Sequence, residues 1–508
     1  MTSPAPADSA TSSSVSLRSV ALVGGASFGQ MLLLLALQRV QARAYGASTE
    51  MDAYLCAYAL PLTIGGILGA ATGTAVVPFA HQQAAAAGAA AANRAVRRIG
   101  IGLTLVSLLL ALPLFLAPSP IIGWLYPGLP SSGNATAAML LRPLCWMIPL
   151  TAMTAYLYGV FHARSRFLRP AIAGLAGPIT TLVMLETVSQ PSIGLLASSI
   201  VAGGIVGLIL LLPGAWTGDA LPHDGAKPSI RGFLALAFPV LLSNAYVQLN
   251  PLVDRLLAQS LSTGSISHLA YSARVINSVA TLATSGLSVV IFPALARHAA
   301  VQDYRQMRGD LSEAWRLITV IMVPVVAGIL LCGRPIIAAF LQVGLFTAAD
   351  TAAVNGLVAA SLGYLVAAAV SEVAVRGLTA LNRAWFVSVV AMIVFTLTSL
   401  TKWLVVGRYQ AVGLAATMSV AGVLAAMVYV GMVSRLTHAR PAAAIVMTLV
   451  RSLLATALSV GLARWWMTDD RVSTVAAGVG LAIVAHPLLL LAFRDEFAVR
   501  AWGARPWS

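Results

Sequence analysis

The sequence predicts an all-α polytopic membrane protein with about 14 transmembrane helices, built as two six-helix lobes in a parallel pseudo-repeat plus two C-terminal helices. The first observation is composition: of 508 residues, 59% are hydrophobic and 9% charged, whereas soluble proteins carry about 25% charged residues. The second is that most apolar runs are about 19–26 residues long, enough for a helix to cross a hydrocarbon core of ~30 Å. The third is an internal echo between the two halves of the chain.

The apolar runs define the predicted transmembrane segments in order. They cover 18–41, 53–80, 99–118, 137–161, 170–188, 193–214, 232–257, 268–295, 316–341, 351–375, 384–406, 409–433, 442–466 and 473–493. No connection between them exceeds roughly twenty residues, which leaves no room for a soluble catalytic domain.

Basic residues gather in alternate connections between these segments. They are Arg94, Arg97 and Arg98; Arg164, Arg166 and Arg169; Lys227 and Arg231; Arg297, Arg305, Arg308 and Arg316; Arg376 and Arg383; and Arg435 and Arg440. By the positive-inside rule, this asymmetry places those connections and both termini in the cytoplasm. The net charge of +15 is therefore attributed to membrane topology, and no nucleic-acid partner is expected.

The echo lies in the second and eighth segments. The stretch AYALPLTIGGILGAATGTAVVPFAHQQAA (57–85) resembles AYSARVINSVATLATSGLSVVIFPALARHAA (270–300) at an offset of about 210 residues. Transporters are commonly built from such repeats, with the substrate site between them. The predicted organisation is a disordered cytoplasmic tail (1–17), an N-terminal lobe (18–216), a C-terminal lobe (228–436), two extra helices (442–493) and a cytoplasmic tail (494–508).

Several kinds of chemistry are not expected. Cys56, Cys145 and Cys332 are scattered inside apolar segments, as expected of small core side chains rather than a disulfide framework or metal site. The seven histidines lack the paired spacing of metal ligands. The sequence therefore predicts no catalytic residues, no metal, no cofactor and no enzymatic activity.

The seventh segment carries an unusual polar stripe in the stretch NAYVQLNPLVDRLLAQSL (244–261). At about 100° per residue, Asn244, Gln248 and Arg255 share one helix face, and Asn250 and Asp254 form an adjacent strip. A charged side chain at the membrane centre costs about 2.5–3.5 kcal/mol on insertion scales. The stripe therefore favours a water-accessible cavity, although snorkelling of the outer charges stays an alternative.

Three further segments show matching polar or small-residue faces. These are Ser27, Gln30, Gln38 and Gln41 in the first segment; Thr63, Gly65, Gly66, Gly69 and Gly73 in the second; and Arg274, Asn277, Ser278, Thr281, Ser285 and Ser288 in the eighth. The hydroxyl positions are equally typical of helix–helix contacts in lipid, and that interpretation stays open. We expect a cavity that opens to the outer side in at least one state.

The expected cavity is cationic. In the charged part of the candidate site, four arginines outnumber two aspartates: Arg39, Arg43, Arg255 and Arg274 against Asp52 and Asp254. A cationic cavity favours an anionic cargo, and the arginine fork suits phosphate. Whether the two aspartates couple transport to protons or sodium, or only pair with arginines, stays open. Glu186 and Lys402 are expected near outer segment ends and are left out of the candidate set.

The segments YGASTEMDAYLCAYALP (45–61), LVDRLLAQSLSTGSISHLAYSARVINSVATLATSGLSVVIFPALARH (252–298) and GLFTAADTAAVNGLVAASLGYL (344–365) resemble the MviN/MurJ family, the lipid II flippases of the MOP transporter superfamily. The resemblance implies a cavity lined by segments one, two, seven and eight, and a groove near segments thirteen and fourteen for a polyprenyl tail. It also implies alternating access for a polyprenyl-diphosphate-linked sugar precursor. Asp52, Arg274 and the Asp254–Arg255 pair match family positions.

The sequence departs from the family pattern at several positions. Met31 and Leu37 stand where arginines are expected, no arginine occurs between Arg43 and Arg94, and Asn277 replaces an acidic residue. The cargo therefore stays open between lipid II and a related lipid-linked glycan. The candidate substrate-binding residues are Gln30, Gln38, Arg39, Arg43, Asp52, Asn244, Gln248, Asp254, Arg255, Arg274 and Asn277.

The leading interpretation is a flippase of the bacterial inner membrane. Its expected partners are an undecaprenyl-diphosphate-linked glycan, membrane lipids and cell-envelope glycan synthases, with protons, sodium or the membrane potential as the energy source. The alternatives are a transport-inactive flippase-like scaffold and a MATE-like drug exporter, although the latter prefers acidic cavity residues. A membrane-bound glycan polymerase or ligase would need an outward catalytic loop, and the longest outward connection (119–136) carries no charge.

Overall fold

The computed structural model describes residues 17–214, 230–438, 441–466, 485–486 and 489. The described residues form helices and contain no strand, so the predicted all-α class is confirmed. Seven of these helices are long and apolar enough to cross a membrane, or up to nine if each of two bent pairs counts as one span. The tails, and the predicted segment 473–493 apart from three positions, lie outside the described residues.

The helices follow the predicted segments closely in order. The N-terminal half contains α1 (Leu17–Tyr45), α2 (Thr49–Leu116), α3 (Pro118–Leu125), α4 (Ser131–Leu144), α5 (Met147–Ala163), α6 (Leu168–Glu186) and α7 (Ile193–Leu211). The C-terminal half contains α8 (Ile230–Ala258), α9 (Ser265–Ala300), α10 (Tyr304–Leu341), α11 (Ala348–Ala360), α12 (Leu362–Ala380), α13 (Ala384–Thr437) and then α14 (Pro441–Trp466).

Helix numbers and predicted segments differ where helices merge or break. α2 holds the second and third segments as two arms that meet at a kink, because Gly88 has a positive φ of 82°. α13 likewise holds the eleventh and twelfth segments, which meet at Gln410 (φ 49°). The fourth segment is divided between α4 and α5, which are bent by 41° to each other. The tenth is divided at Ser361 between α11 and α12.

Backbone geometry supports the predicted repeat. Positive φ angles recur at matching places about 210–220 residues apart, in keeping with two copies of one arrangement. Gly46 follows the first helix of the chain and Gly264 follows α8. Ser165 follows α5 and Asn382 follows α12, and each ends the fourth predicted segment of its half, which is divided between two helices. The boundaries of the two lobes stay a prediction.

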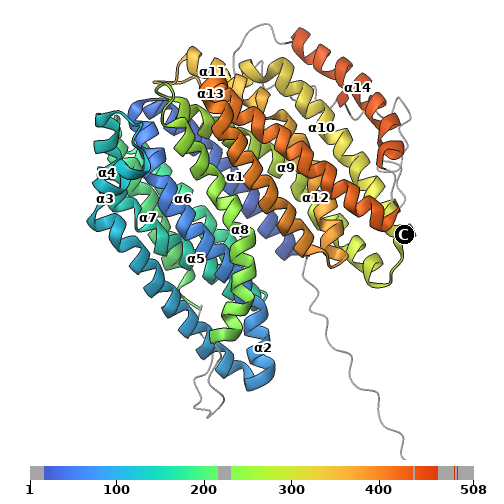
Figure 1. Ribbon diagram of the computed structural model, residues 1–508, viewed down its shortest axis with the longest axis horizontal. Coiled ribbons are helices and arrows are strands. Elements are labelled where there is room, and N and C mark those ends of the chain that lie inside the picture. The colour runs from blue at the N-terminus through green and yellow to red at the C-terminus, as the bar shows by residue number, and fades with distance from the viewer. Residues whose placement is uncertain (1–16, 215–229, 439–440, 467–484, 487–488, 490–508) are drawn as a thin grey trace, which may run out of the picture.

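The two halves lie side by side (Figure 1). Figure 1 shows α3–α7 on one side, α9–α13 on the other, and α14 along the outer edge of the second group. α2 packs on α8 and contacts α9, while α1 contacts both α6 and α10. α2, α8 and α9 therefore meet at the junction, and α1 reaches across it to α10.

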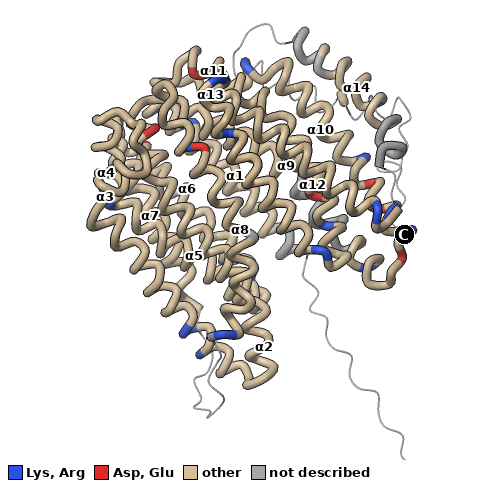
Figure 2. Tube along the Cα trace, in the orientation of Figure 1, with Lys and Arg blue, Asp and Glu red and all other residues tan. Residues whose placement is uncertain are grey.

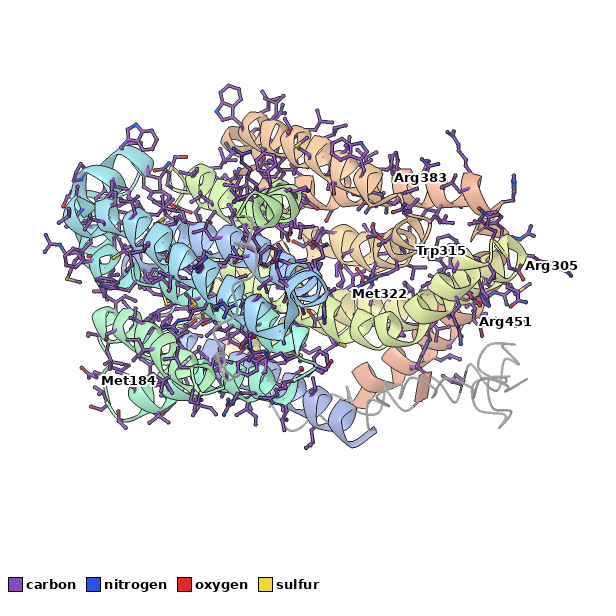
Figure 3. The ribbon with its side chains drawn as sticks, turned by 90° about the horizontal axis from the view of Figure 1, so that it is seen from below. Met184, Arg305, Trp315, Met322, Arg383 and Arg451 are labelled. Atoms are coloured by element: carbon purple, nitrogen blue, oxygen red, sulfur yellow. The ribbon has the colours of Figure 1, made fainter. Side chains whose placement is uncertain are left out.

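Close backbone packing holds the N-terminal half together. A Cβ atom placed on Gly159 of α5 would lie 2.1 Å from the Gly73 carbonyl oxygen of α2. Small residues allow such an approach, and van der Waals packing drives helix association in membranes. In the C-terminal half, Trp315 and Met322 of α10 are buried against neighbouring helices, whereas Arg305 lies at the rim (Figure 3).

The outer surface is apolar between the helix ends. Leu109 and Leu116 are 68% and 67% exposed, and charged residues gather toward the two ends of the helices (Figure 2). Long helices that direct large apolar side chains outward are those of a multi-pass membrane protein, because such side chains face lipid.

A polar junction between the two halves

The buried ammonium of Lys402 is the centre of one polar cluster. Its Nζ lies 2.6 Å from Oδ1 of Asp254, donates to Oδ1 of Asn250 at 2.9 Å and lies 3.5 Å from Sδ of Met418. The Lys402 side chain is 0% exposed and that of Asp254 is 28% exposed. These four residues are called the Lys402 cluster below. Asp254 therefore pairs with a lysine of α13, and neither Arg255 nor Arg274 is its partner.

The local helix geometry explains this choice of partner. Asn250 and Asp254 are four residues apart on α8 and so lie one turn apart on the same face. That face turns to α13, which packs against α8. Arg255 follows Asp254 at about 100° around the helix axis, and this rotation directs it away from Lys402.

Arg255 of α8 and Arg274 of α9 both lie near α2 at the junction. Both lie within electrostatic reach of Tyr54 and Tyr58 of α2, whose rings stack at a centroid distance of 5.7 Å. Nη1 of Arg274 donates to Oε1 of Gln41 at 2.6 Å. Within the part of the chain that the structure describes, Arg255 has neither a hydrogen bond nor an ion pair. Neither arginine is neutralised by a described carboxylate.

The two arginines of α1 have other partners. Nη1 of Arg39 donates to the carbonyl oxygens of Ala339 and Phe340 at 2.9 and 2.7 Å. These carbonyls belong to the last turn of α10, where orphan C=O groups and the helix dipole favour a cation. Arg43 forms a half-exposed ion pair with Glu186 at 2.8 Å. The structure therefore separates Arg39 and Arg43 from the pair Arg255 and Arg274.

Asp52 joins the two halves at one end of the molecule. Its carboxylate accepts hydrogen bonds from the backbone N–H of Gly264 at 2.7 Å, from that of Ser267 at 2.8 Å and from the Ser267 hydroxyl at 2.5 Å. Asp52 is 5% exposed and caps the N-terminus of α9 from α2. The region formed by residues 43–52, 262–268 and 342–350 is called the Asp52 end below.

Further contacts between distant segments close the Asp52 end. The N–H of Leu345 donates to the Arg43 carbonyl at 3.1 Å, and Nε2 of Gln38 donates to the Tyr271 carbonyl at 3.3 Å. The hydroxyl of Tyr271 donates to the Gly46 carbonyl at 3.2 Å. A Cβ atom on Gly264 would lie 2.7 Å from the Ala47 carbonyl oxygen, so glycine is required there by both space and its φ of 87°.

A His–Asp contact also lies at this end. Nε2 of His268 on α9 is 2.8 Å from Oδ1 of Asp350, at the start of α11. Asp350 precedes the predicted segment 351–375 and so lies outside the membrane-spanning part. Burial opposes ionisation of its carboxyl, but hydrogen bonds from Thr347 and His268 outweigh burial and hold the pKa of Asp350 below its usual range. An open pocket of about 450 Å³ adjoins this contact and includes Arg408 and Gln410 in its lining.

The remaining candidates occupy separate positions. The Gln248 carboxamide lies against Gly66 of α2, where a Cβ atom would come within 2.8 Å of Cδ of Gln248. The Asn244 amide donates within its own helix to the Val240 carbonyl at 2.9 Å. Asn277 is exposed one turn after Arg274. Gln30 faces α6 at Gly174 instead of the junction.

The sequence-based candidate set omits Lys402, Met418, Tyr54 and Tyr58. One signal for Lys402 was available, because only two of the 31 basic residues are lysines and this one interrupts an apolar segment. The tyrosines carry no such signal, since buried aromatic residues are common in helix cores. Among the described residues, no group of three or more His, Cys, Asp or Glu side chains could hold a metal ion.

The chain resembles one family of membrane transporters over most of its length. A family model described as lipid II flippase MurJ matches residues 41–485. The probable lipid II flippase MurJ of Vibrio cholerae is 28% identical over 48% of this chain and 48% of that protein. The lipid II flippase MurJ of Burkholderia cenocepacia is 23% identical over 65% of this chain and 67% of that protein. The chain thus spans about half to two thirds of the length of these curated relatives.

Solved structures show the same fold. A lipid II flippase MurJ in an inward closed conformation superposes with a TM-score of 0.80 at 20% identity, and the match covers 94% of this chain and 99% of that one. An inward-facing multidrug resistance MATE family transporter of the MOP superfamily gives a TM-score of 0.64 at 12% identity, covering 80% of this chain and 94% of that one. At these identities the likeness concerns the fold.

Proposed function

Because the chain belongs to the lipid II flippase MurJ family, whose model it matches over residues 41–485, we propose that it moves a polyprenyl-diphosphate-linked sugar precursor across the bacterial cytoplasmic membrane. The cargo is lipid II or a related lipid-linked glycan, carried from the inner to the outer leaflet. The family is one of transporters.

The observation that carries the proposal is the charge balance at the junction. Both nearby carboxylates are engaged, since Asp254 pairs with Lys402 and Asp52 accepts three hydrogen bonds at the start of α9. Arg255 and Arg274 therefore supply uncompensated positive charge beside the polar faces of α8 and α9. A diphosphate is the natural partner of two arginines, because each guanidinium can donate two parallel hydrogen bonds.

The same balance argues against export of cationic drugs. A cationic drug in a membrane cavity needs a free carboxylate to replace its lost hydration. The two carboxylates at this junction are already satisfied by groups of the chain itself. The fold is shared with MATE transporters, but the site chemistry favours an anionic cargo.

The closed Asp52 end fits a transport cycle in which the cavity opens alternately to the two sides of the membrane. In the present conformation, bonds from Asp52 to the start of α9 and from Arg43 to Leu345 hold the two halves together at the Asp52 end. We place this end on the outer side, because the arginine-rich connections lie at the opposite end and the positive-inside rule assigns those to the cytoplasm. The cargo then enters from the inner leaflet, and release requires these bonds to break.

Complementation tests the proposal directly. The chain is expressed in a bacterium depleted of its own lipid II flippase, and growth and lipid-linked intermediates are measured. Arg255→Ala and Arg274→Ala are expected to lower translocation by about tenfold or more, since a hydrogen bond to a charged group is worth about 1.5–3 kcal/mol. Arg305→Ala, at the exposed rim, is the matched control and is expected to behave like the unaltered chain.

The possible results distinguish lipid II from another lipid-linked glycan as the cargo. Restored growth assigns lipid II. Failure to restore growth, with accumulation of another undecaprenyl-linked intermediate when the gene is deleted from its host, assigns that glycan instead. Normal insertion without an effect on either intermediate would contradict transport and favour a scaffold for glycan synthases. Translocation that survives the loss of both arginines would remove the diphosphate-binding role from Arg255 and Arg274.

A further inference from the structure

The one lysine among the described residues is fully buried in the membrane-spanning part of α13. The chain contains 31 basic residues, of which only Lys227 and Lys402 are lysines, and Lys227 is outside the described residues. Lys402 is 0% exposed inside a helix of a chain that otherwise uses arginine. An ammonium is a compact point charge, whereas a guanidinium is a wide planar fork. The positive group that occupies this site is therefore small and nearly spherical.

The surroundings of the ammonium are those of a bound cation. One carboxylate oxygen, one amide oxygen and one thioether sulfur converge on Nζ of Lys402 at 2.6, 2.9 and 3.5 Å. The amide of Asn250 is oriented for this purpose, because its Nδ2 donates to Sδ of Met418 at 3.2 Å and leaves Oδ1 facing Lys402. Oxygen donors at such sites commonly hold small hard cations.

We infer that the Lys402 ammonium is a tethered cation that fills a monovalent-cation site built by α8 and α13. Asn250 and Asp254 come from α8, and Lys402 and Met418 come from the two arms of α13 on either side of the break at Gln410. The chain thereby supplies from within the positive charge that Asp254 needs. Removing the ammonium would open the same site to a cation from solution, because the Asp254 side chain is 28% exposed.

The inference has a consequence for energy coupling, and this consequence rests on the proposed function. If Asp254 is permanently neutralised by Lys402, the unaltered chain does not need Na⁺ or K⁺ at this carboxylate during its cycle. The cation-binding property of the altered chain does not rest on transport. Cation binding by the altered chain and transport by the unaltered chain can therefore fail independently of each other.

Thermal unfolding of the purified full-length protein tests the inference. Lys402→Ala is compared in NaCl, KCl or methylammonium chloride with the same concentration of choline chloride, whose cation is too large for the site. Removal of one partner of a buried ion pair destabilises by leaving the other charge unpaired. We expect at least one small cation to raise the melting temperature of Lys402→Ala by about 2 °C or more over choline. The unaltered chain should show no such difference.

The matched control is Asp254→Asn/Lys402→Ala, which keeps the space but removes the carboxylate, and it should not respond to small cations. Lys402→Gln is the second variant: it retains a hydrogen-bond donor and part of the volume, so it is expected to fold even if the alanine variant does not, and it should show a smaller cation response in the same direction. No cation-specific rise in either single variant, or an equal rise in the double variant, would overturn the inference.

A transport measurement separates this inference from the proposed function. Flipping by the unaltered chain that is equal with and without Na⁺ and K⁺ supports internal neutralisation, whereas flipping that requires one of them at Asp254 overturns it. A cation response in Lys402→Ala, together with no translocation of any lipid-linked glycan by the unaltered chain, would keep the tethered cation and reject the flippase.

Discussion

At the scale of single residues, the adjacent pair Asp254 and Arg255 shows how one step along a helix separates two roles. Asp254 turns to α13 and is neutralised by Lys402, while Arg255 lies within electrostatic reach of the stacked pair Tyr54 and Tyr58 of α2. An ion pair between the two neighbours would have cancelled the charge of Arg255. The lysine of α13 therefore makes the arginine of α8 available.

Asp350 is a second residue whose individual contribution can be measured, because its carboxylate stabilises the fold in a pH-dependent way. Its folded-state pKa is below the ordinary value of 3.8, so it stabilises the fold fully above that value, and the contribution is lost as the pH falls through the lowered pKa. Asp350→Asn is expected to lower the melting temperature at pH 7, with the difference from the unaltered chain shrinking as the pH falls from about 4 toward 3. Melting curves across this range measure the effect.

The control for this prediction is Glu50→Gln, an exposed carboxylate at the same end of the molecule. We expect Glu50→Gln to leave the melting temperature close to that of the unaltered chain at pH 7. A difference for Asp350→Asn that stays constant down to pH 3 would contradict stabilisation by the ionised carboxylate.

At the scale of elements, the contact between α2 and α5 depends on glycines rather than on large apolar side chains. The backbones approach so closely at Gly73 and Gly159 that neither position has room for a Cβ atom. The break points at Gly88 and Gln410 serve a different purpose, since each allows two predicted segments to pack as the arms of one kinked element. Periodicity places helices, and these small or left-handed residues decide how they meet.

Gly159→Ala tests the close approach. The added Cβ would lie 2.1 Å from the Gly73 carbonyl oxygen, so α5 must move away from α2 and lose contacts along its length. Overpacking of this kind costs about 1–3 kcal/mol, and the melting temperature of the purified protein should fall. Gly102→Ala on α2 is the control, because nothing lies within 4 Å of its Cβ position and alanine favours helix. Equal stability of the two variants would contradict the close packing.

At the scale of the whole molecule, the Asp52 end acts as a latch between the two halves. Asp52 of α2 holds the start of α9, and Arg43 and Leu345 join the α1–α2 region to the segment before α11. The halves also meet through α2 and α8, which pack along each other, and through α1 and α10. Opening at the Asp52 end therefore has a small number of identifiable bonds to break.

Asp52→Asn should weaken this latch. Loss of the charge weakens three hydrogen bonds, and a change of about 1.4 kcal/mol shifts a two-state equilibrium tenfold toward the open form. A cysteine introduced at Ser272, which is 3% exposed behind the latch, should then react several-fold faster with a water-soluble maleimide. The measurement uses a background in which the three native cysteines are replaced by alanine.

Asp303→Asn is the matched control for the latch. Asp303 caps α10 through the backbone N–H groups of Arg305 and Gln306, and these contacts lie within the C-terminal half. Its replacement should leave labelling at position 272 unchanged. Equal acceleration by both variants would indicate general destabilisation and would contradict the latch.

The sequence predicted the fold class and the order of helices well, because the length and hydrophobicity of a segment decide by themselves whether it can cross a membrane as a helix. It also placed Arg255 and Arg274 on the polar faces of α8 and α9, and their use in cargo binding stays a prediction. It grouped Arg39 and Arg43 with them, whereas the structure gives Arg39 to the end of α10 and Arg43 to Glu186. The use of Arg39 and Arg43 in cargo binding stays a prediction that their present contacts do not favour.

The sequence by itself determined that this chain is a multi-pass membrane protein with a repeat and with polar residues too costly to face lipid. Only the tertiary structure decided which charges neutralise one another. Lys402 lies 148 residues beyond Asp254 in the chain, yet its Nζ lies 2.6 Å from that carboxylate, because α13 packs against α8. Periodicity along one helix fixes which way a side chain points, but the partner of that side chain comes from another helix. The pairing between helices therefore decides whether a buried charge is neutralised or stays available to bind a cargo.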